Sequence, residues 1–141
     1  MSNALIISDN VTLSDAMENE FSVAGWSSDS ISVSSMMVRD IASKRDLQCV
    51  VLVVDKDFRK RFGGTIEEMS TTICNCASLS PLYLMFEGDY DSSFASWLYH
   101  TKRLFKQTMH QRNLQEAIHE VIRLESEEAI GVALESPMDS L

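Results

Sequence analysis

Two apolar segments of this chain each end in an aspartate, in a position where carboxylates can do chemistry. Asp9 follows the segment 4–8, and Asp55 follows the segment 49–54. Because their apolar residues are continuous rather than alternating, both segments are predicted to be buried parallel strands. Ligands of open α/β sheets bind at the carboxyl ends of the strands, beside the point where strand order reverses. Two carboxylates that meet there repel each other, and a hard cation or a phosphorylated state relieves that repulsion.

The order of elements along the chain predicts the scaffold that positions these aspartates. Strands are expected at 4–8, 29–35, 49–54, 82–86 and 103–106. Helices are expected at 12–21, 35–46 and 65–78, in a short segment through Trp97 and Tyr99, and at 111–128. Strand and helix thus alternate along the chain, which predicts a flavodoxin-like, doubly wound α/β fold. We expect a five-stranded parallel sheet with helices on both faces and right-handed crossovers.

The first helix has the clearest sequence signals. Leu13, Met17 and Phe21 recur at helical spacing and predict its buried face. Thr12 is expected to be the N-cap, with Asp15 three residues later in an arrangement close to a capping box.

Composition limits the class of protein. At 141 residues, with 45% hydrophobic and 23% charged residues, the chain resembles one soluble globular domain. We expect that domain at 1–128, with an acidic tail or the start of a linker at 129–141. A net charge of −9 argues against nucleic-acid binding, since phosphate neutralisation needs clustered Lys and Arg. No apolar run approaches the ~20 residues that cross a bilayer, and no secretory signal is visible, so we expect a cytoplasmic protein without membrane association.

The three cysteines suggest neither a disulfide framework nor a metal site. Cys49 begins a strand that is predicted to be buried, and Cys74 and Cys76 have no histidine near them in sequence. We expect all three to be reduced packing residues, which fits a cytoplasmic protein.

The element order and a few residues resemble the receiver domain of bacterial response regulators over about residues 3–125. The segment 5–10 is similar to that family's first strand, which ends in an acidic pair that holds Mg²⁺. Asp55 stands where the family has its phosphate-accepting aspartate, and Lys106 stands where it has its lysine.

The resemblance implies a role for each of these residues. Asp55 would be the nucleophile toward phosphorus. Asp9 would be the main Mg²⁺ ligand, and Asp55 and the main-chain carbonyl of Asp57 would be the others. Lys106 would hold the phosphoryl group as a point charge or pair with the free aspartate.

Four departures from the family pattern weaken this phosphorylation site. Ser8 occupies the first acidic position, so we expect Mg²⁺ to bind weakly. Phe86 or Glu87 ends the fourth strand, where the family has a Thr or Ser hydroxyl that follows the phosphoryl group. Arg103 replaces an aromatic switch residue, and Gln107 replaces a proline. The resemblance therefore implies an atypical receiver or pseudo-receiver that no longer switches with phosphate.

An interaction surface is expected at Trp97, Tyr99 and Arg103, together with the outer side of 111–125. The corresponding face is the usual partner surface of receivers, and aromatic anchors suit an interface. Burial of Trp97 and Tyr99 in the core is the alternative interpretation.

Three functions compete. The leading hypothesis is a non-enzymatic signalling module of a bacterial two-component or related pathway that binds a kinase, an effector or a second copy of itself. The alternative is a working phosphoacceptor, phosphorylated on Asp55 by a histidine-kinase system. A small flavodoxin-like enzyme or nucleotide binder is the third hypothesis, but neither GxGxxG nor GxxxxGK[ST] follows the first strand.

Overall fold

The computed structural model describes residues 3–33, 47–55, 68, 71–72, 80–88 and 92–139, without the side chains at 93, 94 and 128–139. Five parallel strands form one sheet, and β1 to β5 span, in order, Asn3–Ile7, Ser27–Ile31, Cys49–Val54, Leu82–Phe86 and Gln107–His110. The α-helices described in full are α1 (Val11–Val23), α5 (Ser92–Thr101) and α6 (Leu114–Asp139). Two 3₁₀ turns flank β5, namely η2 (Lys102–Leu104) and η3 (Gln111–Asn113).

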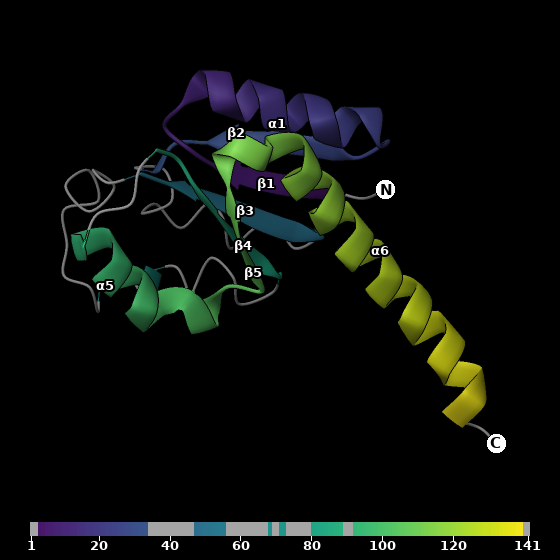
Figure 1. Cartoon of the computed structure of the whole chain (residues 1–141). Coiled ribbons are helices and arrows are strands. Elements are labelled where there is room, and N and C mark those ends of the chain that lie inside the picture. Colours follow the sequence, from purple (N-terminus) through teal and green to yellow (C-terminus); the bar gives the residue numbers. More distant parts are fainter. Residues whose placement is uncertain are drawn as a thin grey trace.

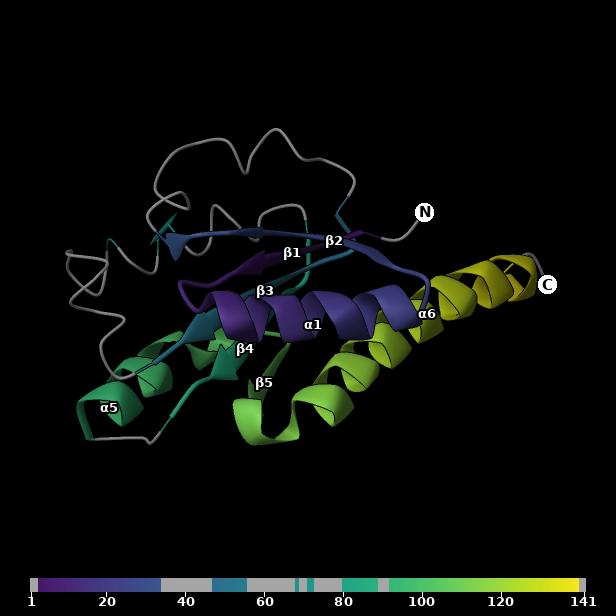
Figure 2. The same ribbon diagram turned by 90° about the horizontal axis from the view of Figure 1, so that it is seen from above.

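The strand order is β2-β1-β3-β4-β5, and every neighbouring pair is parallel. This order confirms the predicted flavodoxin-like α/β fold. Helices α1 and α6 lie side by side on one face of the sheet and α5 lies on the other (Figures 1 and 2). The order reverses between β1 and β3, so the carboxyl ends of these two strands lie next to each other.

The central strand β3 is buried on both faces, which explains its uninterrupted apolar sequence. Cys49, Val51 and Val53 pack into the cluster that contains α1 and α6 residues. Their alternating neighbours, Val50, Leu52 and Val54, pack with Trp97 and Leu98 of α5. Cys49 is a free, buried thiol, as predicted, whereas Cys74 and Cys76 lie outside the described residues.

The first helix begins one residue before the predicted start, with a different cap. Asn10 is the N-cap, since its side chain accepts a hydrogen bond from the Leu13 backbone N–H at 3.1 Å. The predicted Thr12 cap and its pairing with Asp15 are therefore wrong, because Thr12 already lies inside the helix. Asparagine is at least as favourable an N-cap as threonine. Because Asn10 comes before Thr12 in the chain, the helix begins directly after Asn10.

The second strand also begins earlier than predicted, at Ser27 rather than at 29. Gly25 has a φ of +83°, in the left-handed region that favours glycine. The N–H groups of Gly25 and Trp26 bond back to the Ser22 and Phe21 carbonyls, both at 2.9 Å. This tight helix end returns the chain to the sheet within a few residues.

The fifth strand was predicted at 103–106 and lies instead at Gln107–His110. Residues 102–104 form η2, and the Phe105 N–H closes this turn on the Lys102 carbonyl at 3.1 Å. Leu104 and Phe105 suggested a strand because they are apolar. They are apolar because they pack against the α5 side of the sheet.

The last helix extends to Asp139, well past the predicted end at 128. The backbone of 129–139, which was predicted to be an acidic tail or the start of a linker, continues α6 as a helix. The far half of α6 projects beyond the sheet (Figure 1). The division into 1–128 and 129–141 stays a prediction.

Two predicted helices lie largely outside the described residues. Nothing in 35–46 is described, and of 65–78 only residues 68, 71 and 72 are described, all three helical. In the part of the chain that is described, no helix is both long enough and apolar enough to span a membrane.

Candidate functional site

The candidate site lies at the carboxyl edge of the sheet, where all five parallel strands end. Asp9 and Asp55 follow the neighbouring strands β1 and β3, as predicted. Asp55 is half-buried and Asp9 is exposed. Glu87 comes after β4 and directly follows Phe86, whose register partner Val54 precedes Asp55. Asp55 and Glu87 are therefore neighbours at this edge.

Asp9 and Ser8 fix the loop after β1. Asp9 Oδ1 accepts a hydrogen bond from the Val33 N–H at 2.9 Å, which joins this loop to the one after β2. Ser8 is 7% exposed, and its Oγ accepts the Asn10 N–H at 3.0 Å. Ser8 thus forms the turn into α1, in the position where the family has an acidic metal ligand.

Asn10 joins the loops after β1 and β4. Its Oδ1 caps α1, and its Nδ2 donates a hydrogen bond to Glu87 Oε1. The loop position is supported by a backbone bond from the Glu87 N–H to the Val54 carbonyl at 2.8 Å. One asparagine side chain therefore both starts a helix and orients the Glu87 carboxylate.

Gly88 connects the loop after β4 to the end of β5. Its N–H donates to Gln111 Oε1, and its carbonyl meets His110 Nε2, each at 3.2 Å. His110 Nδ1 accepts the Arg112 N–H at 3.0 Å, which assigns the ring proton to Nε2. The loop after β4 is thus tied to β1 on one side and to β5 on the other.

Lys106 does not lie at this edge, and its predicted placement beside Asp55 is wrong. It precedes β5, and its N–H bonds the carbonyl of Leu82, the first residue of β4, at 2.7 Å. Its Nζ pairs with Glu125 Oε2 at 2.9 Å. The prediction failed because the whole fifth strand lies later in sequence, so His110 and Gln111 occupy the carboxyl end instead.

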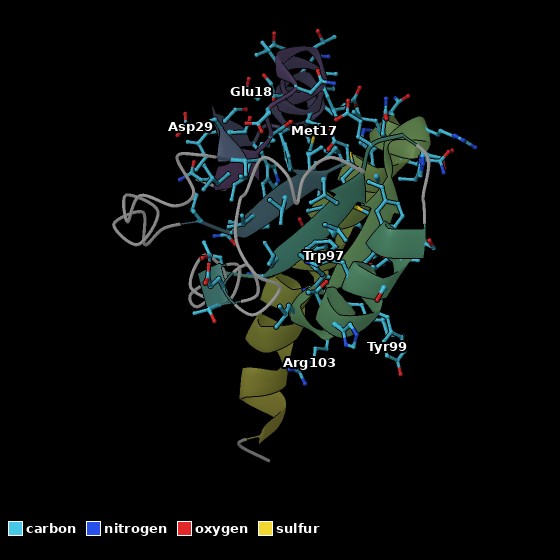
Figure 3. All side chains as sticks on the ribbon, turned by 90° about the vertical axis from the view of Figure 1, so that its left-hand side faces the viewer. Met17, Glu18, Asp29, Trp97, Tyr99 and Arg103 are labelled. Carbon is cyan, nitrogen blue, oxygen red and sulfur yellow. The ribbon has the colours of Figure 1, made fainter. Side chains whose placement is uncertain are left out.

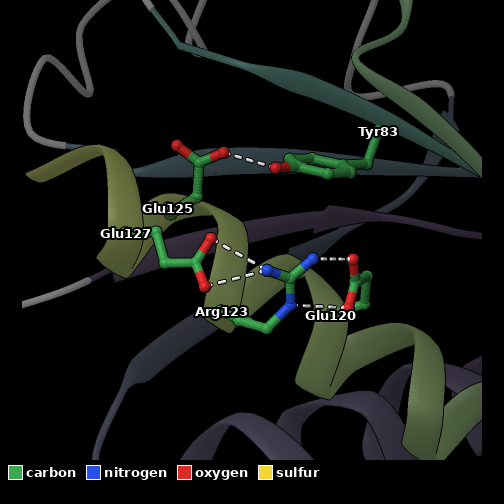
Figure 4. Close-up of polar contacts among 5 residues, drawn as sticks. All are labelled: Tyr83, Glu120, Arg123, Glu125 and Glu127. Atoms are coloured by element: carbon green, nitrogen blue, oxygen red, sulfur yellow. Dashed lines mark hydrogen bonds and ion pairs between the residues drawn. The ribbon is translucent and has the colours of Figure 1, made fainter. Parts of the chain in front are cut away.

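Glu125 has a second partner. Its carboxylate accepts a hydrogen bond from the Tyr83 hydroxyl (Figure 4). The pKa of the nearby Cys49 thiol is raised to about 12, mainly by burial and also by the Glu125 carboxylate, while the Lys106 cation acts in the opposite direction. These residues form a buried polar cluster at the amino edge of the sheet, opposite the candidate site.

Metal ligation gains little support from the described residues. They contain no group of three or more His, Cys, Asp or Glu side chains that could hold an ion. Asp57, whose carbonyl was the third proposed ligand, lies outside the described residues. Asp9 and Asp55 are the remaining candidates, and Asp9 already accepts a backbone N–H.

The predicted interaction surface is partly wrong. Trp97 is fully buried and packs in the core between α5 and the sheet. Tyr99 is 72% exposed, and Arg103 is also exposed. Figure 3 shows Trp97 directed toward the sheet and Tyr99 and Arg103 directed away from it. Helical geometry explains the difference, because residues two apart do not share a helix face.

Sequence reasoning missed Asn10, Glu125 and His110 as residues with specific contacts. Asn10 had a readable signal, since asparagine before a helical pattern is a strong N-cap candidate. The contacts of Glu125 and His110 depend on where β5 begins, so no local signal reveals them.

The sequence matches no family model and no curated protein. The fold is similar to that of a response regulator CheY-like protein from Mesorhizobium loti, with a TM-score of 0.66 and 9% identity over 88% of this chain and 98% of that one. It is also similar to a CheY-like response regulator receiver domain protein from Methanospirillum hungatei, with a TM-score of 0.61 and 10% identity over 91% of this chain and 98% of that one. At such low identity, the likeness establishes the receiver fold alone.

Proposed function

We propose that this chain is a non-enzymatic, receiver-like signalling module that binds a protein partner through a constitutive surface, without a phosphate-driven switch. It would act in a two-component or related regulatory pathway. The fold supports the receiver comparison over nearly the whole length of both structures. The observation that carries the proposal is that Asn10 holds the Glu87 carboxylate, and that Glu87 follows Phe86 as Asp55 follows its register partner Val54.

Glu87 opposes phosphorylation by charge. A phosphoryl group on Asp55 would bring additional negative charge next to a carboxylate, and like charges at close range disfavour each other. The receiver family uses a Thr or Ser hydroxyl after this strand, which follows the phosphoryl group and moves the loop. Here the loop is already fixed by Asn10, His110 and Gln111.

The cation that would offset this repulsion is at the other edge. Lys106 is paired with a buried carboxylate, and such a pair is costly to break because it would leave Glu125 without its cation. We expect any Mg²⁺ site to be weak for the same reason, since Ser8 supplies no charge.

The proposal is tested by incubating the protein with Mg²⁺ and acetyl phosphate and measuring intact mass. We expect slow or absent labelling of the wild type. Glu87→Thr, which removes the carboxylate beside Asp55, should be labelled faster. The control is Glu116→Thr, which makes the same change of charge at an exposed position of α6. It should be labelled as slowly as the wild type.

The second candidate function is a working phosphoacceptor, and the half-buried position of Asp55 after β3 favours it. Near-complete labelling of the wild type that is lost in Asp55→Asn would establish this alternative and reject the proposal.

A further inference from the structure

An exposed corner of the molecule combines an aromatic ring with two cations that have no acidic partner among the described residues. It consists of Tyr99 and His100 in α5 and Lys102 and Arg103 in η2, all four exposed. We propose that this Tyr99 corner docks an acidic segment of a partner protein, whose carboxylates pair with Lys102 and Arg103. The inference rests on the proposed function, because it specifies the partner chemistry of the constitutive surface.

The charges of the corner are unusual for this chain. The sequence has 21 acidic and 12 basic residues, so a cation has many carboxylates to choose from. Arg123 pairs with Glu120 and Glu127 (Figure 4). In the described part of the chain, by contrast, no carboxylate lies within ion-pair distance of Lys102 or Arg103. Two adjacent cations that no described carboxylate neutralises, on an acidic protein, are complementary to an acidic partner.

The tyrosine ring is kept at the surface by its neighbours. Lys102 Nζ lies 5.8 Å from the centroid of the Tyr99 ring, and the His100 ring meets it edge-on at 5.5 Å. Tyr99 nevertheless remains 72% exposed, which is unusual for a large aromatic side chain. Tyrosine and arginine are enriched among the residues that dominate binding energy at interfaces.

The corner also stands on a rigid base. Trp97 and Thr101, on the opposite side of α5, are fully buried. The Thr101 hydroxyl bonds the Trp97 carbonyl at 3.0 Å. Because the inner side of α5 is fixed to the sheet, the outer side presents its rings and cations in one arrangement, which lowers the entropy lost on binding.

A protein segment fits this corner better than a polyanion does. Nucleic acids and anionic membranes are bound by larger clusters of Lys and Arg. A net charge of −9 on the whole chain repels such surfaces at long range. A short segment with a few carboxylates is repelled less, because it carries less charge and needs only the local pair of cations.

The test is selection of a random peptide display library on the immobilised full chain. We expect the selected peptides to be enriched in Asp and Glu, and to bind about tenfold more weakly to Arg103→Glu. Arg112→Glu is the matched control, since Arg112 is also an exposed arginine in a 3₁₀ turn and the charge change is equal. It should bind the peptides like the wild type.

Three outcomes would overturn the inference: no enriched peptides, peptides without acidic enrichment, or equal loss of binding in Arg103→Glu and Arg112→Glu. A wild-type dimer that Arg103→Glu dissociates would also overturn it, by making a second copy the occupant. Repeating the binding of the selected peptides with Mg²⁺ and acetyl phosphate separates this inference from the proposed function. A large rise in affinity that is absent in Asp55→Asn would reject the constitutive surface and retain the acidic docking site.

Discussion

Glu125 is a buried carboxylate whose partners come from β4 and from the residue before β5. The Tyr83 hydroxyl on β4 and Lys106, just before β5, both contact the same carboxylate oxygen. A buried charge is tolerated only when it is paired and hydrogen-bonded, and both conditions are met here. Since Glu125 belongs to α6, these contacts fix the helix to the amino edge of the sheet.

The same cluster gives Cys49 a testable pH dependence. Burial raises the pKa of its thiol from 9.0 to about 12. Between these values the unfolded state loses the proton and the native state keeps it. The free energy of unfolding should therefore be unaffected by this group well below pH 9.0 and fall above it, by up to ~1.4 kcal/mol per pH unit.

Urea unfolding measured across this pH range checks the prediction, with Cys49→Ala as the control because tyrosine and lysine side chains also titrate there. The variant should lose less stability with rising pH than the wild type does. Identical slopes for the two proteins would show that the thiol does not stay protonated in the native state.

At the scale of elements, Asn10 joins the start of α1 to the loop after β4. Asn10→Ala should destabilise the protein by roughly 1–2 kcal/mol, because it removes both the helix cap and the bond to Glu87. Asn10→Ser keeps a capping oxygen and loses only the bond to Glu87, so it should cost less. Urea unfolding of both variants measures the two contributions.

Comparison of Asn10→Ala with Asn10→Ser separates the helix cap from the bond to Glu87. If Asn10→Ser is as destabilising as Asn10→Ala, the cap contributes nothing and the structural role assigned to it is wrong. If neither variant is destabilised, the junction between the two loops does not stabilise the fold.

The elements that were predicted well are those whose sequence reflects burial on both faces. Strands β3 and β4 were placed correctly, since continuous apolar runs have few other interpretations. Strand β5 was misplaced because its own sequence, Gln107–His110, is largely polar, whereas the apolar pair before it packs as a turn. Edge strands carry weaker patterns because only part of each is buried.

The misplacement of β5 also limited how much of the candidate site could be predicted from the sequence. Asp9 and Asp55 follow the well-marked strands and were placed correctly at the carboxyl edge. Lys106 was assigned through the fifth strand, and a shift of its start moved the lysine to the opposite edge. The Asn10–Glu87 contact joins residues far apart in sequence and depends on the packed arrangement of both loops.

At the scale of the whole molecule, the two edges of the sheet have distinct roles. The carboxyl edge holds the aspartates and three interconnected loops, after β1, β4 and β5. The amino edge fixes α6, which then projects away from the sheet (Figure 2). The Tyr99 corner lies on the α5 face, supported by the buried side of that helix. Such an arrangement suits a module whose binding surface is permanently formed.

We propose that this receiver-like chain does not change conformation through phosphorylation. Two-dimensional amide spectra recorded with and without Mg²⁺ and acetyl phosphate test it most directly. We expect the signals of residues 86–110 to remain in place, because the loop after β4 is already tied to Asn10, His110 and Gln111. Shifts across these residues that disappear in Asp55→Asn would contradict the account.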